Sequence, residues 1–216
     1  MDGAFEIVLV FLLLTDLVLL GASRLRNAIR VVAAQGLALG LLPLLEHGQM
    51  TWHATVLGLG SAGLKGFVFP ALLNRAMQET QARREIEPYV GYVLSLLAGV
   101  GVLAICFAFG SRLPLPWEPA SRTLIPAGLF TVWTGLFLIV ARRKAITQVL
   151  GYVAMENGIF ALGMVLAESM PLVVEMGVML DVFVAVFVMG IMVFHINREF
   201  DHIDADQLSA LKDGAQ

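Results

Sequence analysis

Residues 4–22 read AFEIVLVFLLLTDLVLLGA, a run whose only charged side chains are Glu6 and Asp16. A helix needs about 20 mostly apolar residues to cross the hydrocarbon core of a bilayer, so this run has the length of one membrane span. Asp2 and Glu6 stand at its start, where a secretory signal peptide would carry positive charge. We therefore expect the segment to remain in the protein as a first transmembrane helix.

Six further apolar runs follow the first one. They cover approximately residues 28–45, 52–73, 89–110, 123–141, 146–167 and 171–195. The 216-residue chain is 58% hydrophobic and 14% charged, with a mean hydropathy of +0.83, whereas a soluble domain carries about 25% charged residues. The sequence predicts an all-α fold, a polytopic membrane helix bundle with about seven transmembrane helices. A soluble enzyme domain is excluded.

The overall charge is small and negative. A formal net charge of -3 at pH 7 leaves no basic field that would hold nucleic acid. The single cysteine, Cys106, lies inside an apolar run, and one cysteine alone forms neither an internal disulfide nor a thiolate metal site. The lipid bilayer is therefore the partner that the composition predicts.

Basic residues alternate between the predicted loops, and this alternation predicts the orientation of the chain. Cytoplasmic loops of membrane proteins accumulate Lys and Arg. One side of the predicted bundle holds only Arg112 and Arg122. The other side holds Arg24, Arg26, Arg30, Arg75, Arg83, Arg84, Arg142, Arg143, Lys144 and Arg198. We expect a multi-pass protein of the inner (cytoplasmic) membrane, with its N-terminus outside and its C-terminus in the cytoplasm.

A weak internal repeat predicts how the helices are grouped. Arg26-Asn27-Ala28-Ile29 opens the second run much as Arg143-Lys144-Ala145-Ile146 opens the sixth, which suggests two three-helix units with an extra helix between them. The predicted divisions are an N-terminal three-helix unit (1–88), an extra helix with a periplasmic loop (89–122), a C-terminal three-helix unit (123–198) and an acidic cytoplasmic tail (199–216).

Four ionisable side chains fall near the middle of the predicted helices: Asp16, Lys65, Glu156 and Asp181. With a rise of about 1.5 Å per residue, each lies roughly 15 to 20 Å deep. A charged group at the centre of a membrane helix costs about 2.5 to 3.5 kcal/mol. We therefore expect these side chains to face the interior of the bundle and not the lipid.

Two interpretations of these groups remain open. Lys65 can form fixed ion pairs with Asp16 or Asp181, which would hold the helices in register. Alternatively, the acids pass protons to one another through Lys65 and bound water. Three carboxylates face one lysine, and burial favours the protonated form of an acid that has no cationic partner. We therefore predict a proton relay.

Three further residues are candidates for the same relay. Tyr152 shares one helix face with Gln148 and Glu156, because the three are spaced four residues apart; we expect Tyr152 to hydrogen-bond within the path. Glu175 lies about one turn below the outer surface, where it is either the mouth of a path or only an interfacial residue. His195 lies at the cytoplasmic edge, where an imidazole can exchange protons with bulk water but needs no function.

Motifs that would hold a metal, a phosphate or a haem do not occur in the sequence, which lacks H-E-x-x-H, C-x-x-C-H and a Gly-rich phosphate loop. We therefore expect no catalytic residue, no metal ligand and no cofactor in this chain.

The segment Gly151-Tyr152-Val153-Ala154-Met155-Glu156-Asn157-Gly158, with Val174-Glu175-Met176-Gly177 and Asp181-Val182-Phe183-Val184-Ala185-Val186, resembles hydrogenase-4 component E. Residues 65–70 and 208–212 are also similar, so the likeness covers most of the chain. That family provides a membrane subunit of formate hydrogenlyase-type, group 4 nickel-iron hydrogenases. The last three predicted helices are similar, more distantly, to the K-type subunit of respiratory complex I and to the C-type subunit of multi-subunit sodium/proton antiporters.

The resemblance implies a place in a proton-translocating membrane arm. Glu156 would stand at the first buried glutamate of the K-type subunit and Asp181 at the second. Two departures weaken the second assignment, since position 181 is Asp in place of Glu and the basic cluster lies farther from Glu156 than in the K-type pattern. In that family the nickel-iron and iron-sulfur clusters belong to partner subunits. The implied partners are other membrane-arm subunits and peripheral hydrogenase subunits.

We therefore expect a non-catalytic integral membrane subunit of an oxidoreductase complex, in which Glu156 and Asp181 exchange protons and Lys65 adjusts their proton affinity. A subunit of a multi-subunit cation/proton antiporter and a purely structural membrane scaffold are the alternatives.

Overall fold

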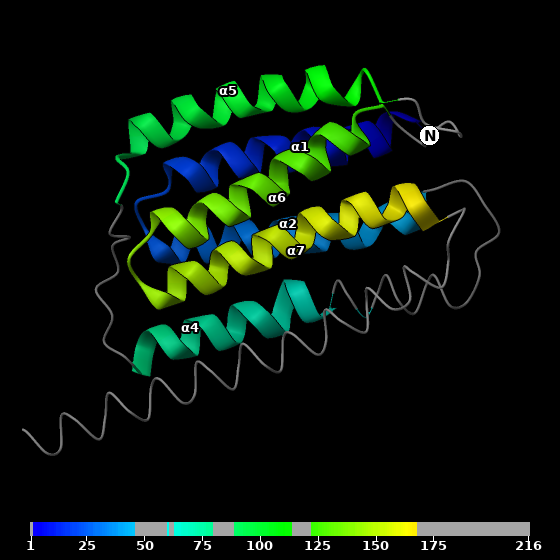
Figure 1. Ribbon diagram of the computed structural model, residues 1–216. Helices are drawn as coiled ribbons and strands as arrows, with labels where there is room; N and C mark the ends of the chain where they lie inside the picture. The colour runs from blue at the N-terminus through cyan, green and yellow to red at the C-terminus, as the bar shows by residue number, and fades with distance from the viewer. Residues whose placement is uncertain (1, 46–59, 61–62, 80–88, 114–121, 168–216) are drawn as a thin grey trace, which may run out of the picture.

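The computed structural model describes residues 2–45, 60, 63–79, 89–113 and 122–167, and these residues are almost entirely helical (Figure 1). Its elements are α1 (Asp2–Gly21), α2 (Leu25–Leu45), η1 (Leu64–Val68), α4 (Phe69–Glu79), α5 (Tyr92–Gly110), α6 (Leu124–Ala141) and α7 (Ala145–Ala167). The predicted all-α class is confirmed. The run at 171–195, the tail at 199–216 and residues 52–59 and 61–62 of the run at 52–73 lie outside the described residues.

Four of the described helices are long and apolar enough to cross a membrane. Their candidate spans are Gly3–Gly21, Tyr92–Gly110, Leu124–Ala141 and Ile146–Val165. Helix α2 is as long, but Arg26 and Arg30 lie in its first two turns and lower its hydropathy. Length, composition and the apolar side chains exposed on α1 and α5 make the chain a membrane protein.

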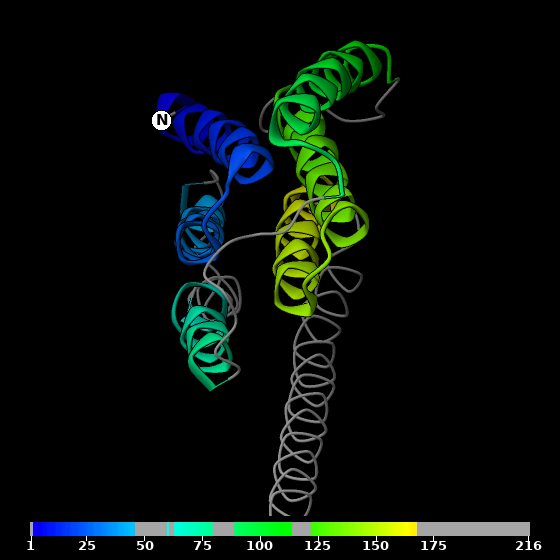
Figure 2. The ribbon, with the colours of Figure 1, turned by 90° about the vertical axis from the view of Figure 1, so that its left-hand side faces the viewer.

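The described helices are arranged in two layers. One layer contains α1, α2 and α4, and the other contains α5, α6 and α7, as the view along the helices shows (Figure 2). Across the layers α1 contacts α5 and α6, while α7 contacts α2 and α4. Residues far apart in the sequence therefore meet in the space between the layers.

Helix boundaries follow the predicted runs closely except after residue 73. The run was expected to end there, but α4 continues to Glu79 through Asn74, Arg75 and Gln78. Hydropathy marks where a helix leaves the apolar region, whereas Ala, Leu, Met, Gln and Glu all favour the helix itself. The helix therefore continues beyond the end of the apolar run.

Helices α6 and α7 pack backbone to backbone along a glycine seam. Gly128 and Gly135 on α6 face Gly151 and Gly158 on α7, both pairs spaced seven residues apart. A Cβ added to Gly135 would lie 2.4 Å from the Met155 nitrogen, and one added to Gly158 would lie 2.5 Å from the Val132 nitrogen. Only glycine permits this approach, which is typical of helix contacts in membranes.

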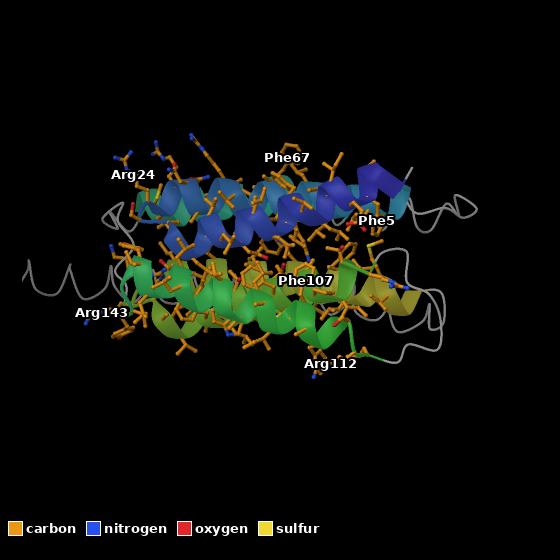
Figure 3. The ribbon with its side chains drawn as sticks, turned by 90° about the horizontal axis from the view of Figure 1, so that it is seen from above. Phe5, Arg24, Phe67, Phe107, Arg112 and Arg143 are labelled. Carbon is orange, nitrogen blue, oxygen red and sulfur yellow. The ribbon has the colours of Figure 1, made fainter. Side chains whose placement is uncertain are left out.

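The two ends of the bundle carry different basic residues. Arg24 and Arg143 lie at one end of the bundle (Figure 3). Arg112 lies toward the opposite end, where Phe5 also lies. The sequence placed Arg24 and Arg143 together on one side and Arg112 on the other. The structure agrees with that grouping for these three residues.

Candidate functional site

A polar layer crosses the middle of the bundle between two apolar clusters. The first cluster contains Leu19, Val32, Leu138, Leu150 and Ala154, and the second contains Leu12, Leu39, Ala127 and Ala161, among others. On α1, α2, α6 and α7 a set of buried polar residues falls between the members of the two clusters. They are Thr15 and Asp16 on α1, Gln35 on α2, Thr131 and Thr134 on α6, and Glu156 and Asn157 on α7.

Asp16 is fully buried and joins three helices. Its Oδ1 accepts a hydrogen bond from Gln35 Nε2 at 2.8 Å, and its Oδ2 accepts one from Thr131 Oγ1 at 2.6 Å. Gln35 Nε2 also donates to Thr15 Oγ1 at 3.0 Å. The described partners of Asp16 are thus neutral donors from α2 and α6. The ion pair with Lys65 that the sequence allowed does not occur among them.

Glu156 and Lys65 are both buried, 2% and 3% exposed, on opposite layers of the bundle. The Lys65 Nζ lies 5.5 Å from the centre of the Phe160 ring. Phe160 follows Glu156 by four residues on α7, so the two side chains share one helix face. The lysine ammonium therefore lies beside the α7 face that carries Glu156.

The backbone around Lys65 departs from a regular α-helix. Leu64–Val68 forms a π-helical turn, and Pro70 follows within the first turn of α4. Proline removes one backbone donor, and single π turns inside helices occur often at functional sites. A Cβ added to Gly36 would lie 2.6 Å from the Lys65 Cβ, so the glycine beside Gln35 allows Lys65 to approach α2.

The polar stripe on α7 runs from an exposed end to the buried middle of the helix. Gln148 is exposed, Tyr152 is half-buried and Glu156 is buried. Gln148 Nε2 donates to the Arg142 carbonyl at 3.2 Å, so this residue caps the turn between α6 and α7. Tyr152 therefore lies between the end of the bundle and Glu156.

Several polar atoms of the layer are buried without a hydrogen-bond partner among the described residues. They are Gln35 Oε1, Thr134 Oγ1, and both amide atoms of Asn157. Buried polar atoms generally have a partner, and where protein supplies none it is ordered water. These atoms therefore have the chemistry to bind water inside the bundle.

Arg142 forms a second buried site, which the sequence did not indicate. It is fully buried at the end of α6, where its Nη2 donates to the Leu20 carbonyl at 2.9 Å and its Nη1 donates to the Val90 carbonyl at 3.4 Å. Its guanidinium also lies 5.2 Å from the Tyr92 ring centre. Burial lowers the pKa of Arg142, and Tyr92 partly offsets this effect.

The remaining predicted relay residues, Asp181, Glu175 and His195, lie outside the described residues. Among the predicted relay residues that the structure describes, Lys65 lies beside the α7 face that carries Glu156. Asp16 lies in a separate hydrogen-bond network with Gln35 and Thr131. Sequence reasoning did not assign Thr131, Thr15 or Gln35 to the site. Their signal was the presence of a polar side chain at mid-helix in otherwise apolar runs.

The geometry defines a class of protein, a polytopic membrane helix bundle with ionisable groups in an interior polar layer. Within the described residues, no three His, Cys, Asp or Glu side chains come together as a metal site. Asp16 is held by hydroxyl and amide donors, and Lys65 lies beside the α7 face that carries Glu156. Buried carboxyl groups in such surroundings can take up and release protons.

Comparisons with known proteins place the chain in a family. It is 33% identical to the uncharacterized protein Rv0085 of Mycobacterium tuberculosis over 204 residues, which cover 94% of this chain and 93% of that protein. The chain therefore belongs to the same family as that protein. No family model matches the chain, and no solved structure matches it significantly.

A second relative has a descriptive name. The chain is 32% identical to hydrogenase-4 component E of Escherichia coli K12 over 120 residues, which cover 56% of this chain and 55% of that protein. The match to hydrogenase-4 component E of Shigella flexneri has the same extent. The match spans about half the length of these proteins and supports a related family.

Proposed function

We propose that the chain is a non-catalytic membrane subunit of a hydrogenase-type complex, in which its buried carboxylates take part in proton translocation. The observation that carries the proposal is the burial of Glu156 beside the Lys65 region in a relative of hydrogenase-4 component E. The nickel-iron and iron-sulfur chemistry belongs, in this proposal, to partner subunits. These are peripheral hydrogenase subunits and other subunits of the membrane arm.

Glu156 is the central proton-exchanging group of the proposal. A lysine ammonium near a carboxylate favours the ionised form, whereas burial favours the neutral form. Movement of Lys65 relative to Glu156 would therefore change the proton affinity of Glu156. The remaining relay residues of the proposal are Tyr152, Asp16, Asp181, Glu175 and His195.

The arrangement in the membrane is part of the same proposal. We place the chain in the inner membrane with seven spans, the N-terminus outside and the C-terminus in the cytoplasm. The grouping of Arg24 and Arg143 at the end opposite Arg112 supports this orientation.

The test is a Glu156→Gln substitution in the intact complex, reconstituted into vesicles. Glutamine keeps the shape and polarity of the side chain but cannot release a proton. We expect normal assembly and a fall of about tenfold or more in protons moved per turnover of the partner enzyme. Normal coupling in the Gln variant would contradict the proposal and leave a structural scaffold.

Glu6→Gln is the matched control for this experiment. It makes the same chemical change on α1, but Glu6 lies in the first turns of that helix and is only half-buried. We expect coupling in this variant to equal that of the unmodified complex. An equal loss in both variants would mean that the Glu156 result reflects damage to the bundle.

A further inference from the structure

We infer that Asp16 is a second proton-binding site, in which the hydroxyl hydrogen of Thr131 changes its acceptor when Asp16 takes up a proton. The site lies on α1, α2 and α6, away from the α7 face that carries Glu156. The inference rests on the proposed function only in that the bound proton would be one that the membrane arm moves.

The first argument is the pair of acceptors around Thr131. Its Oγ1 lies 2.6 Å from Asp16 Oδ2 and 2.9 Å from the Ala127 carbonyl oxygen. One hydroxyl has a single hydrogen, which can be donated to only one of these oxygens at a time. The two acceptors therefore define two states of the site without movement of any heavier atom.

The ionised state uses the bond to Asp16. There Thr131 donates to Oδ2 and Gln35 Nε2 donates to Oδ1, so that each carboxylate oxygen accepts from a neutral donor. Hydrogen bonds to a charged oxygen are roughly twice as strong as those between neutral groups. Two such bonds offset part of the cost of a buried negative charge.

The protonated state uses the bond to Ala127. A hydronium ion transfers one proton to Asp16 Oδ2 and leaves as water. The new Oδ2–H group donates to Thr131 Oγ1, whose own hydrogen turns to the Ala127 carbonyl, 2.9 Å away. Gln35 continues to donate to Oδ1, now the carbonyl oxygen of the acid. The Asp16 carboxyl group, the Thr131 hydroxyl and the Gln35 amide nitrogen thus keep a hydrogen-bond partner in both states.

Other ionisable groups approach Asp16 only indirectly. Lys65 packs against Gly36 of α2, which follows Gln35 in the sequence. Toward the end of α1, Arg142 binds the Leu20 carbonyl, four residues after Asp16. Cys106 of α5 packs with Leu20 and Phe130. None of these groups makes a described hydrogen bond to Asp16, and its described side-chain partners are the neutral donors Gln35 and Thr131.

The test is infrared spectroscopy of the intact complex with carboxyl-labelled aspartate, recorded as the pH is varied. We expect a carboxylic acid C=O band that titrates with pH and that Asp16→Asn removes. Thr131→Val has nearly the same shape but no hydroxyl. Loss of a bond to the charged oxygen should move the midpoint of this band upward by about one pH unit. Thr131→Ser keeps the hydroxyl and should restore the unmodified midpoint.

Thr134→Val is the matched control. Thr134 is buried on the same helix, and its hydroxyl has no hydrogen-bond partner among the described residues. Its replacement should leave the Asp16 midpoint unchanged. A band that does not titrate, or equal shifts in Thr131→Val and Thr134→Val, would overturn the inference. Coupling in Glu156→Gln tests the proposed function separately, so either proposal can fail while the other stands.

Discussion

Arg142 links three helices through one side chain, although its sequence position suggested an ordinary residue of a cytoplasmic loop. The last carbonyls of a helix have no partner within the helix. Leu20 presents such a carbonyl at the end of α1, and the guanidinium donates to it and to the Val90 carbonyl, which precedes α5. A cation near the C-terminal end of α1 also interacts favourably with the helix dipole.

Arg142→Met should therefore lower the free energy of unfolding by about 2 to 4 kcal/mol, since the buried Leu20 carbonyl and the partly buried Val90 carbonyl lose a charged donor. Unfolding of the chain in mild detergent, followed by circular dichroism, measures the change. Arg143→Met is the control, because Arg143 is exposed and lies over the exposed Tyr89 ring; we expect a change within about 0.5 kcal/mol. Equal effects would mean that the carbonyl bonds of Arg142 contribute nothing measurable.

The burial of individual ionisable residues was predictable, but their partners were not. Depth along a helix follows from counting residues, and it placed Asp16, Lys65 and Glu156 in the interior. Contacts between helices depend on how each helix is rotated about its axis and on which helices pack together. The hydropathy pattern of one sequence determines neither. The pairing of Asp16 with Thr131 joins residues 115 positions apart, and only the packing of α1 on α6 brings them together.

The glycine seam between α6 and α7 sets how closely these two helices approach each other. Gly158 follows Glu156 and Asn157, so the distance between α6 and α7 also fixes how these polar side chains enter the layer. The sequence predicted both helices and most of their boundaries from hydropathy. It did not predict the π turn at Leu64–Val68, because a π turn changes the hydrogen bonding within a helix without changing its hydropathy.

Gly158→Ala should destabilise the contact between α6 and α7 by about 1 to 3 kcal/mol, because the new methyl group would meet the Val132 and Gly128 backbones. Gly163→Ala on the same helix is the control. A Cβ added to Gly163 has no neighbour within 4 Å, and alanine favours a helix over glycine by about 1 kcal/mol. Thermal unfolding of both variants in detergent should give opposite signs; equal destabilisation would contradict the seam.

The two-layer bundle as a whole has Arg24 and Arg143 at one end and Arg112 toward the other. The charge alternation in the sequence was sufficient to predict that Arg24 and Arg143 lie together, away from Arg112. It could not predict the two layers, because the order of helices along the chain does not specify which faces meet.

Single cysteines at positions 24, 112 and 143 test the orientation, in a Cys106→Ser background that removes the native thiol. All three arginines are exposed. With the proposed orientation, an impermeant thiol reagent added outside intact cells should label position 112 only. Positions 24 and 143 should react only after the membrane is opened. Labelling of 24 and 112 from the same side would contradict the arrangement.

We propose that this chain is a membrane subunit of a hydrogenase-type complex. Its most direct test is extraction of the native complex in mild detergent through a tag on this chain, followed by mass spectrometry of the proteins that remain bound. We predict subunits with nickel-iron and iron-sulfur sites together with further membrane-arm subunits. Recovery of antiporter-type membrane subunits alone, or of this chain without partners, would contradict the claim.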